Sequence, residues 1–131
     1  MRALLDAHAF IWWVLDMPNL SDDSRRILAD GANEIIVSVA SAYEIVYKAE
    51  QGRLTLPEAP GGYVRSRIAA NGFTSLPIGF AHALRAGALP RIHGDPFDRI
   101  LVAQAQHEGL TLVADDGEIA KYEVELLEAT A

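Results

Sequence analysis

The stretch DPFDRILVAQAQHEGLTLVAD, residues 95–115, joins an expected helix to an expected strand. A proline is well suited to the first position of a helix, so the helix should begin at Pro96. At helical spacing Asp98 lies on the same stripe as Leu101 and Ala105, which is apolar and should face the interior. A carboxylate at the edge of an apolar stripe is costly unless another group compensates it. The position of Asp98 therefore raises the question of which group compensates its charge.

Strand and helix patterns alternate along the whole chain in the same way. Short runs rich in β-branched residues and leucine predict strands at residues 2–6, 34–38, 73–77, 111–115 and 124–127. Longer stretches predict helices at residues 7–16, 21–29, 39–51, 63–72, 81–89 and from about 96, with a short one at 117–121. Residues 52–62 are expected to form a loop. Strands that alternate with helices predict an α/β fold, in which a mostly parallel sheet of about five strands has helices on both faces.

Length and composition limit the classes of protein to which the chain can belong. Its 131 residues suit a single domain, residues 1–131, and half of them are hydrophobic. The chain has no cysteine, which excludes disulfides, thiolate metal sites and a cysteine nucleophile. The apolar run AFIWWVL, residues 9–15, is shorter than the roughly 20 residues that span a bilayer, so a soluble cytoplasmic protein is expected. A net charge of −7 argues against a broad basic surface for nucleic acid.

Several acids are expected to gather at one end of the predicted sheet. Asp6 follows the first strand, and Asp115 and Asp116 follow the strand at 111–115. Asp98 lies in the first turn of its helix, and Glu44 lies in the helix after the second strand. Because the carboxyl ends of parallel strands form one crevice, these side chains should meet there.

Each acid also has a simpler explanation when it is considered alone. Aspartate at a helix N-terminus caps free backbone N–H groups, which is worth about 1 kcal/mol. Ser41 and Glu44 match a capping box, and Glu44 could also pair with Lys48 one turn later. Considered together, several neighbouring carboxylates cannot all stay ionised without a counter-charge. A bound Mg²⁺ or Mn²⁺ would supply that charge, would compensate Asp98 and would make the local charge less negative than the net charge.

Four segments of the sequence occur in an order that resembles a known family. They read LLDAHAFIWW, SVASAYEIVYKAEQGRL, HGDPFDRILVAQA and GLTLVADD, and the likeness extends from Arg2 to about Leu127. In this order they are similar to PIN-domain nucleases of the VapC toxin type. The resemblance implies a PIN-like three-layer sandwich that hydrolyses RNA phosphodiester bonds with Mg²⁺ or Mn²⁺. It also implies a homodimer that is silenced by a cognate VapB-type antitoxin, with which it could form a hetero-oligomer.

The resemblance assigns catalytic and metal-binding roles to four acids of this chain. Asp6 and Asp98 match the acids expected to bind a metal directly. Glu44 and Asp116 match acids that would bind a second ion, bind through water or orient the nucleophile. Asp95 is then interpreted as the cap of its helix.

The sequence also departs from the family pattern at two positions. Ala7 stands where the family often has threonine, and Ala114 stands where it often has threonine or serine. A hydroxyl at either position could orient a water molecule or a ligand. The strength of the activity is therefore open, and a degenerate PIN domain that only binds a partner is an alternative. The role of Asp115, next to the matched acid, is also open.

An acidic nuclease must still attract RNA, so its basic residues are of interest. Three cations near the acids in sequence are candidates for phosphate contact: Lys48, Arg91 and Arg99. Ordinary solvated surface positions are the alternative for each of them. His8, two residues after Asp6, could approach the site or lie on the helix surface.

Two further groups of residues carry structural expectations. Three large aromatic side chains predict a heavily buried first helix: Phe10, Trp12 and Trp13. Three histidines lack the spacing of metal ligands and are expected at the surface: His82, His93 and His107.

Two other α/β classes fit the sequence less well. A nucleotide-binding module needs glycines in its first strand-to-helix turn, and that turn is Asp6-Ala7-His8 here. A phospho-acceptor receiver domain would have an acidic pair after the first strand and a lysine after the last, and the sequence shows neither.

Overall fold

The computed structural model describes residues 1–92, 94–115 and 117–131. At its centre is a five-stranded sheet in the order β3-β2-β1-β4-β5, in which neighbouring strands are parallel. The strands are β1 Arg2–Leu5, β2 Glu34–Ser38, β3 Thr74–Leu76, β4 Thr111–Ala114 and β5 Leu126–Glu128. The predicted α/β fold with a sheet of about five strands is confirmed.

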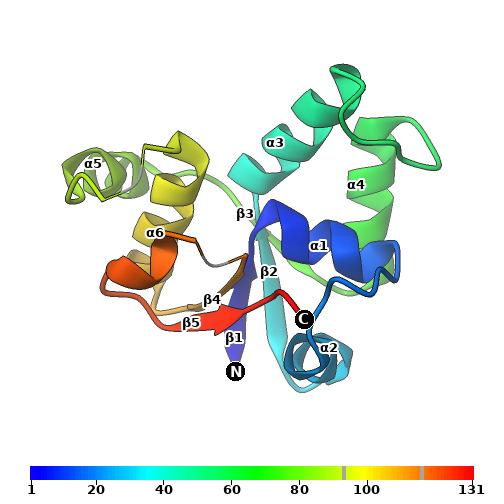
Figure 1. Cartoon of the computed structure of the whole chain (residues 1–131), viewed down its shortest axis with the longest axis horizontal. Coiled ribbons are helices and arrows are strands. Elements are labelled where there is room, and N and C mark those ends of the chain that lie inside the picture. The colour runs from blue at the N-terminus through cyan, green and yellow to red at the C-terminus, as the bar shows by residue number, and fades with distance from the viewer. Residues whose placement is uncertain (93, 116) are drawn as a thin grey trace.

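Helices cover both faces of the sheet (Figure 1). They are α1 Ala7–Val14, α2 Asp22–Ala29, α3 Val39–Glu50, α4 Pro60–Ala70, α5 Phe80–Ala88, α6 Pro96–Glu108 and the 3₁₀-helix η1 Ile119–Lys121. Figure 1 shows α1, α3 and α4 on one side of the strands, and α5 and α6 on the other. The longest of the described helices, α6, has 13 residues, and no described helix has the length and hydropathy of a membrane span.

Alternating strand residues supply two apolar cores, one on each face of the sheet. On one face Leu5 and Val37 pack with buried residues of α1, α2, α3 and α4. On the other face Leu4, Ile36 and Leu112 pack with buried residues of α6 and η1. This alternation follows from the geometry of a strand, in which successive side chains point to opposite faces. The result is the expected three-layer arrangement of helices, sheet and helices.

The order of the strands determines where a ligand can bind. β1 lies at the centre of the sheet, with β2 and β3 on one side and β4 and β5 on the other. The chain therefore reverses its direction of winding between β1 and β4, which is the point where open α/β sheets bind ligands. The Asp6 N–H extends the pairing of these two strands by donating to the Val113 carbonyl at 2.9 Å.

The start of α3 agrees with the expectation, but the residue that caps it does not. The helix begins at Val39, directly after β2, and the Ser38 hydroxyl caps it by accepting a hydrogen bond of 3.0 Å from a backbone N–H of the first turn. The predicted capping box of Ser41 and Glu44 is therefore wrong. Ser41 lies inside the helix, and its hydroxyl donates to the Leu5 carbonyl at 3.3 Å.

The first helix is less buried than its aromatic residues suggest. Phe10 is fully buried, but Trp12 and Trp13 are only partly buried and pack against the core from its edge. The indole N–H of Trp13 donates to Asn71 Oδ1 at 3.0 Å, which links the end of α1 to the end of α4. Each tryptophan therefore keeps part of its ring at the surface.

Candidate functional site

Asp6 lies between the end of β1 and the start of α1, and only 6% of its surface is exposed. Its Oδ1 accepts a hydrogen bond of 2.7 Å from the Ala9 N–H, so it caps α1. Its Oδ2 accepts a hydrogen bond of 3.0 Å from the Asp115 N–H, just after β4. The capping role that the sequence allows is therefore present, and two backbone donors fix the orientation of the carboxylate.

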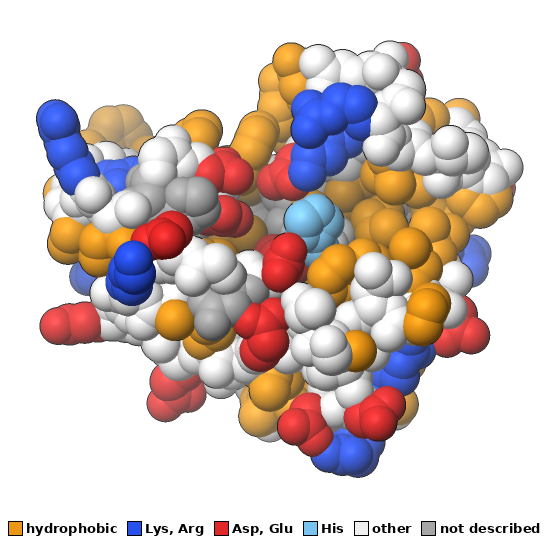
Figure 2. Space-filling view, viewed as in Figure 1, with side chains coloured by type: hydrophobic (Ala, Val, Ile, Leu, Met, Phe, Trp, Pro, Cys, Tyr) orange, Lys and Arg blue, Asp and Glu red, His pale blue; other side chains and the backbone are white. Residues whose placement is uncertain are grey.

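The Asp6 carboxylate borders a small cavity of about 110 Å³ at the carboxyl end of the sheet. The described residues that line this acidic cavity are Asp6, Ala7, His8, Glu44, Lys48, Asp95, Asp98 and Asp115. Figure 2 looks onto this face, where acidic side chains gather around a hollow beside a histidine. Three of the four predicted acids thus meet here: Asp6, Glu44 and Asp98. The fourth, Asp116, lies outside the described residues.

Burial and neighbouring charge make the ionised form of Asp6 unfavourable. Burial raises the pKa of the Asp6 carboxyl from 3.8 to about 7, and the charge of Asp98 raises it as well. The two backbone N–H donors and the nearby His8 lower the pKa, but burial outweighs them. A divalent cation would offset this cost, and carboxylate oxygens are the ligands that Mg²⁺ and Mn²⁺ prefer. The carboxylates that line the acidic cavity are therefore donors of the chemical type that such an ion binds.

The two aspartates at the start of α6 have different roles. Asp95 caps the helix, because its Oδ1 accepts a hydrogen bond of 2.9 Å from the Phe97 N–H. Pro96 takes the first helical position, and Asp98 lies in the first turn, where the helix dipole favours a negative charge. Because Asp98 borders the acidic cavity, its position at the edge of the apolar stripe has a structural reason.

Asp115 and His8 also border the cavity, although no definite role could be assigned to either from sequence. His8 Nδ1 lies 3.3 Å from Asp115 Oδ2, and both side chains are about half exposed. The Thr130 hydroxyl donates to Asp115 Oδ1 at 3.0 Å. In the sequence, the contact of His8 with Asp115 is indicated by an acid at a strand end and by a histidine two residues after Asp6. Only the register of β1 and β4 brings the two side chains together.

Of the three predicted cations, Lys48 is the one that borders the acidic cavity. Its Nζ lies 2.6 Å from Glu44 Oε2, which is the pairing one helical turn apart that the sequence allowed. Arg91 and Arg99 line a different pocket. The Arg99 guanidinium donates to three carbonyls at the end of α5 at 2.9–3.0 Å, those of Ala86, Leu89 and Pro90. Arg99 therefore joins α6 to α5.

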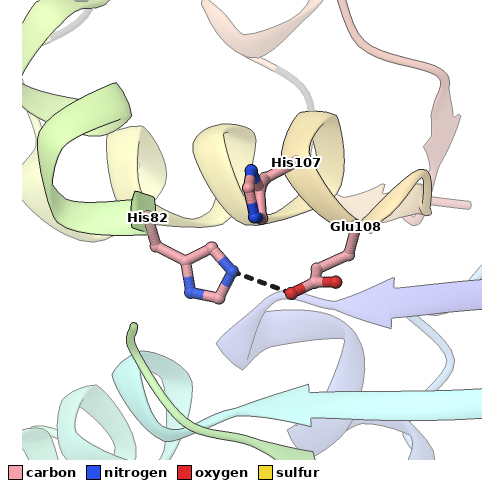
Figure 3. Close-up of side chains that lie close together, drawn as sticks. All are labelled: His82, His107 and Glu108. Atoms are coloured by element: carbon pink, nitrogen blue, oxygen red, sulfur yellow. Dashed lines mark hydrogen bonds and ion pairs between the residues drawn. The ribbon is translucent and has the colours of Figure 1, made fainter. Parts of the chain in front are cut away.

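His82 is buried, with 5% of its surface exposed, so the prediction that it lies at the surface is wrong. It lies on α5 and faces α6, where His107 and Glu108 are its neighbours (Figure 3). His82 Nε2 lies 3.0 Å from Glu108 Oε1, and the ring centroids of His82 and His107 are 5.3 Å apart. His107 is exposed, as expected, and His93 lies outside the described residues.

Among the described residues, these three side chains are the group of possible metal ligands whose ligand atoms lie within 4.8 Å of one another. The hydrogen bonds favour a structural role. The Gly79 N–H donates to His82 Nδ1 at 2.9 Å, so the proton of the neutral imidazole lies on Nε2 and is donated to Glu108. Metal binding through Nε2 would require this proton to leave and Gly79 to lose its acceptor. The cluster also lies about 15 Å along α6 from Asp98, at the opposite end of the helix.

The sequence matches the family model of the PIN domain over residues 3–125. It is 32% identical over 114 residues to Ribonuclease VapC22 of Mycobacterium tuberculosis, an alignment that covers 86% of this chain and 85% of that relative. It is 36% identical over 61 residues to Ribonuclease VapC16 of the same organism, which covers 47% of this chain and 43% of that relative. The sequence likeness to a ribonuclease thus extends over most of the chain.

Solved structures share the fold at lower sequence identity. A chain of VapBC2 from Rickettsia felis, bound to a DNA fragment from its promoter, matches with a TM-score of 0.71 and 17% identity over 98% of both chains. A chain of VapBC-5 from Mycobacterium tuberculosis, a member of the VapBC family of toxin–antitoxin systems, matches with a TM-score of 0.62 and 14% identity over 99% of this chain and 98% of that chain. The chain therefore belongs to the PIN-domain family and, within it, to the VapC type.

Proposed function

We propose that this protein is the cytoplasmic toxin of a type II toxin–antitoxin system and cleaves RNA with bound Mg²⁺ or Mn²⁺. The observation that carries the proposal is the acidic cavity, where Asp6, Glu44 and Asp98 meet at the switch point of the parallel sheet. Both curated relatives are named ribonucleases, which supports the class of reaction. We take residues 1–131 as a single PIN domain, because one sheet carries both apolar cores.

The four acids have distinct proposed roles. Asp6 and Asp98 would hold the metal directly, and the two backbone donors to Asp6 orient its carboxylate. Glu44 and Asp116 would bind a second ion, bind through water or orient the attacking water. A bound divalent ion would lower the pKa of that water and offset the charge of the phosphate.

Lys48 is the cation best placed to assist the reaction. It borders the acidic cavity, and its ion pair with Glu44 holds the ammonium near the acids. An ammonium in this position attracts a phosphodiester that the carboxylates alone would repel. Arg91 and Arg99 are weaker candidates for phosphate contact, because the Arg99 guanidinium already holds the backbone of α5.

The proposed partners are a cognate VapB-type antitoxin and a second copy of the chain, in a homodimer or a hetero-oligomer. Structural neighbours of the chain come from VapBC toxin–antitoxin complexes, which supports such a partner. Several large apolar side chains are exposed, among them Tyr43, Tyr47, Phe80 and Leu84. A groove of about 510 Å³ lies beside Tyr43, between α3 and α4. Exposed apolar surface of this kind is typical of sites that bind other proteins.

A degenerate PIN domain that binds a partner without cutting RNA is the second candidate. Ala7 borders the acidic cavity, and Ala114 is fully buried at the end of β4. Neither residue offers a hydroxyl to orient water. The two candidates differ in one measurable property, which is metal-dependent cleavage.

The proposal is tested by incubating the purified protein with a mixed pool of bacterial RNA in Mg²⁺, in Mn²⁺ and in EDTA, and sequencing the new RNA ends. We expect cleavage with either metal and none in EDTA. Asp6→Asn and Asp98→Asn should each lose more than the roughly 100-fold typical of groups that only support a metal ligand. Asp22→Asn is the matched control, because Asp22 is exposed in the first turn of α2. Equal cleavage by wild type and Asp6→Asn would reject the assignment, and a wild type that cuts nothing would favour the binding module.

A further inference from the structure

A second cavity lies next to the acidic cavity and shares Ala7, His8 and Lys48 with it. It measures about 240 Å³ and lies between α1, α3 and the loop that follows α3. Much of its remaining lining is apolar and includes Ile45 and Leu54. In Figure 2 hydrophobic side chains continue from the histidine on the side away from the acidic hollow. An apolar cavity therefore opens beside the proposed metal site.

Trp12 contributes an aromatic side chain to the lining of this second cavity. Its ring is partly buried and stacks on that of His8, with ring centroids 5.4 Å apart and an interplanar angle of 8°. Two cations, Lys48 and Arg53, also line the cavity. Aromatic rings beside cations are typical of sites for single-stranded nucleic acid, since bases stack on the rings while the cations contact phosphates.

We propose that the second cavity binds the nucleobase next to the phosphate that is cut, with Trp12 as the surface on which the base stacks. This inference rests on the proposed function, because the acidic cavity defines which phosphate is attacked. Lys48 lines both cavities, so the backbone between that phosphate and the stacked base passes this ammonium. The substrate class that follows is unpaired RNA, because a base inside a duplex is not free to enter a side cavity.

The two tryptophans of the chain allow a direct test. Trp13→Phe leaves Trp12 as the only tryptophan, and Trp12→Phe leaves Trp13, while both variants keep an aromatic ring at each position. Trp13 is the matched control, because its indole bonds to Asn71 and it is not among the described residues that line either cavity. Each variant is titrated with a short single-stranded oligoadenylate, with Ca²⁺ in place of Mg²⁺. An abasic oligomer of the same length and charge serves as the control ligand.

Oligoadenylate should quench the fluorescence of the Trp13→Phe variant and leave that of Trp12→Phe nearly unchanged, and the abasic oligomer should quench neither. Trp12→Leu should bind oligoadenylate about 5- to 150-fold more weakly, as expected for the loss of one stacked base. In cleavage of unpaired RNA, the same variant should show a raised KM with little change in kcat. A kcat effect alone would indicate a disturbed acidic cavity and would count against the base site.

Equal quenching of both single-tryptophan variants would overturn the inference, and so would quenching by the abasic oligomer. An unchanged KM for Trp12→Leu, in a protein that does cleave RNA, would overturn the base site and leave the proposed function intact. If wild type cleaves no RNA in Mn²⁺ while quenching remains specific to Trp12, the proposed activity fails and the base-binding cavity stands.

Discussion

The Asp6 carboxylate accepts a hydrogen bond of 3.0 Å from the Asp115 N–H and so joins the ends of β1 and β4. The same carboxylate caps α1 through the Ala9 N–H. One buried acid therefore stabilises the fold and also borders the acidic cavity. Without a cation these two roles conflict, because burial raises the pKa of Asp6 to about 7 and disfavours the charge that a metal ligand needs.

Replacing Asp6 with asparagine should change how stability depends on pH in the metal-free protein. The folded pKa of about 7 lies above the ordinary 3.8, so the folded state holds this proton more tightly than the unfolded state. The contribution of Asp6 is fully present below the lower pKa and is lost as the pH rises through the higher one. Asparagine does not titrate. The free energy of unfolding of Asp6→Asn, relative to wild type, should therefore rise by up to about 4 kcal/mol between about pH 4 and about pH 8.

Urea denaturation in EDTA at several pH values measures this difference. Any constant cost of the substitution, such as the weakened contact with the Asp115 N–H, cancels when the two ends of the pH range are compared. Asp22→Asn, at an exposed position of α2, should show no comparable rise. A difference between Asp6→Asn and wild type that is flat with pH would contradict the prediction.

Much of the fold could be predicted from sequence, because in several elements the local sequence pattern agrees with the burial that the tertiary structure imposes. β2 and β4 are apolar runs that are buried on both faces, as strands of a parallel sheet usually are. α6 begins with an aspartate cap and a proline, and it ends at Gly109, whose φ of 68° is left-handed. The meeting of Asp6 and Asp98 follows from the same logic, because strand ends and the helices beside them share one edge of a parallel sheet.

The features that sequence could not show depend on which elements pack together. Nothing in the segment AHALRAGAL, residues 81–89, indicates that His82 is buried. Its burial comes from the contact of α5 with α6. Ser38 and Ser41 are equally good caps by sequence, and the end of β2 decides between them. Arg99 lies one residue after Asp98, yet it contacts the end of α5 because the two helices pack side by side.

Divalent metal should stabilise the folded protein through the acidic cavity. At a concentration of about 100 times its Kd, an ion that binds only the folded state adds about 2.7 kcal/mol. Mn²⁺ or Mg²⁺ should therefore raise the Tm of wild type by several degrees near neutral pH, and it should raise that of Asp6→Asn or Asp98→Asn much less. Thermal denaturation with added KCl at matched ionic strength controls for screening. An equal rise in Tm for all three proteins would show that the ion binds outside the acidic cavity.

His82 and His107 should differ sharply in their effect on stability. His82→Ala removes the acceptor of the Gly79 N–H and the partner of Glu108, which should cost about 1–3 kcal/mol. His107→Ala changes an exposed residue and should stay within about 0.5 kcal/mol of wild type. Chemical denaturation measures both values. A rise in Tm with Zn²⁺ that His107→Ala abolishes would show that this cluster binds metal and would contradict its structural assignment.

Substitutions should show that Lys48 is a substrate-binding cation and that Arg99 is a structural one. Arg99→Ala removes three hydrogen bonds to the carbonyls at the end of α5, so it should lower the free energy of unfolding by about 2 kcal/mol while RNA affinity stays unchanged. Lys48→Met keeps the aliphatic stem and removes the charge beside the acidic cavity. Its cost in stability should be about 1–3 kcal/mol, because Glu44, with only 13% of its side chain exposed, loses its ion-pair partner.

The salt dependence of RNA binding distinguishes the two cations further. If Lys48 contacts one phosphate, Lys48→Met should reduce the slope of log K against log salt by about 0.7, the value for one contact with a single strand. Arg99→Ala should leave that slope unchanged. The opposite pattern would be an altered slope for Arg99→Ala and an unaltered slope for Lys48→Met. It would indicate that RNA phosphates bind in the pocket of Arg91 and Arg99 instead. RNA would then approach the acids from the side of α6, because the residues that line this pocket lie at the start of that helix and just before it.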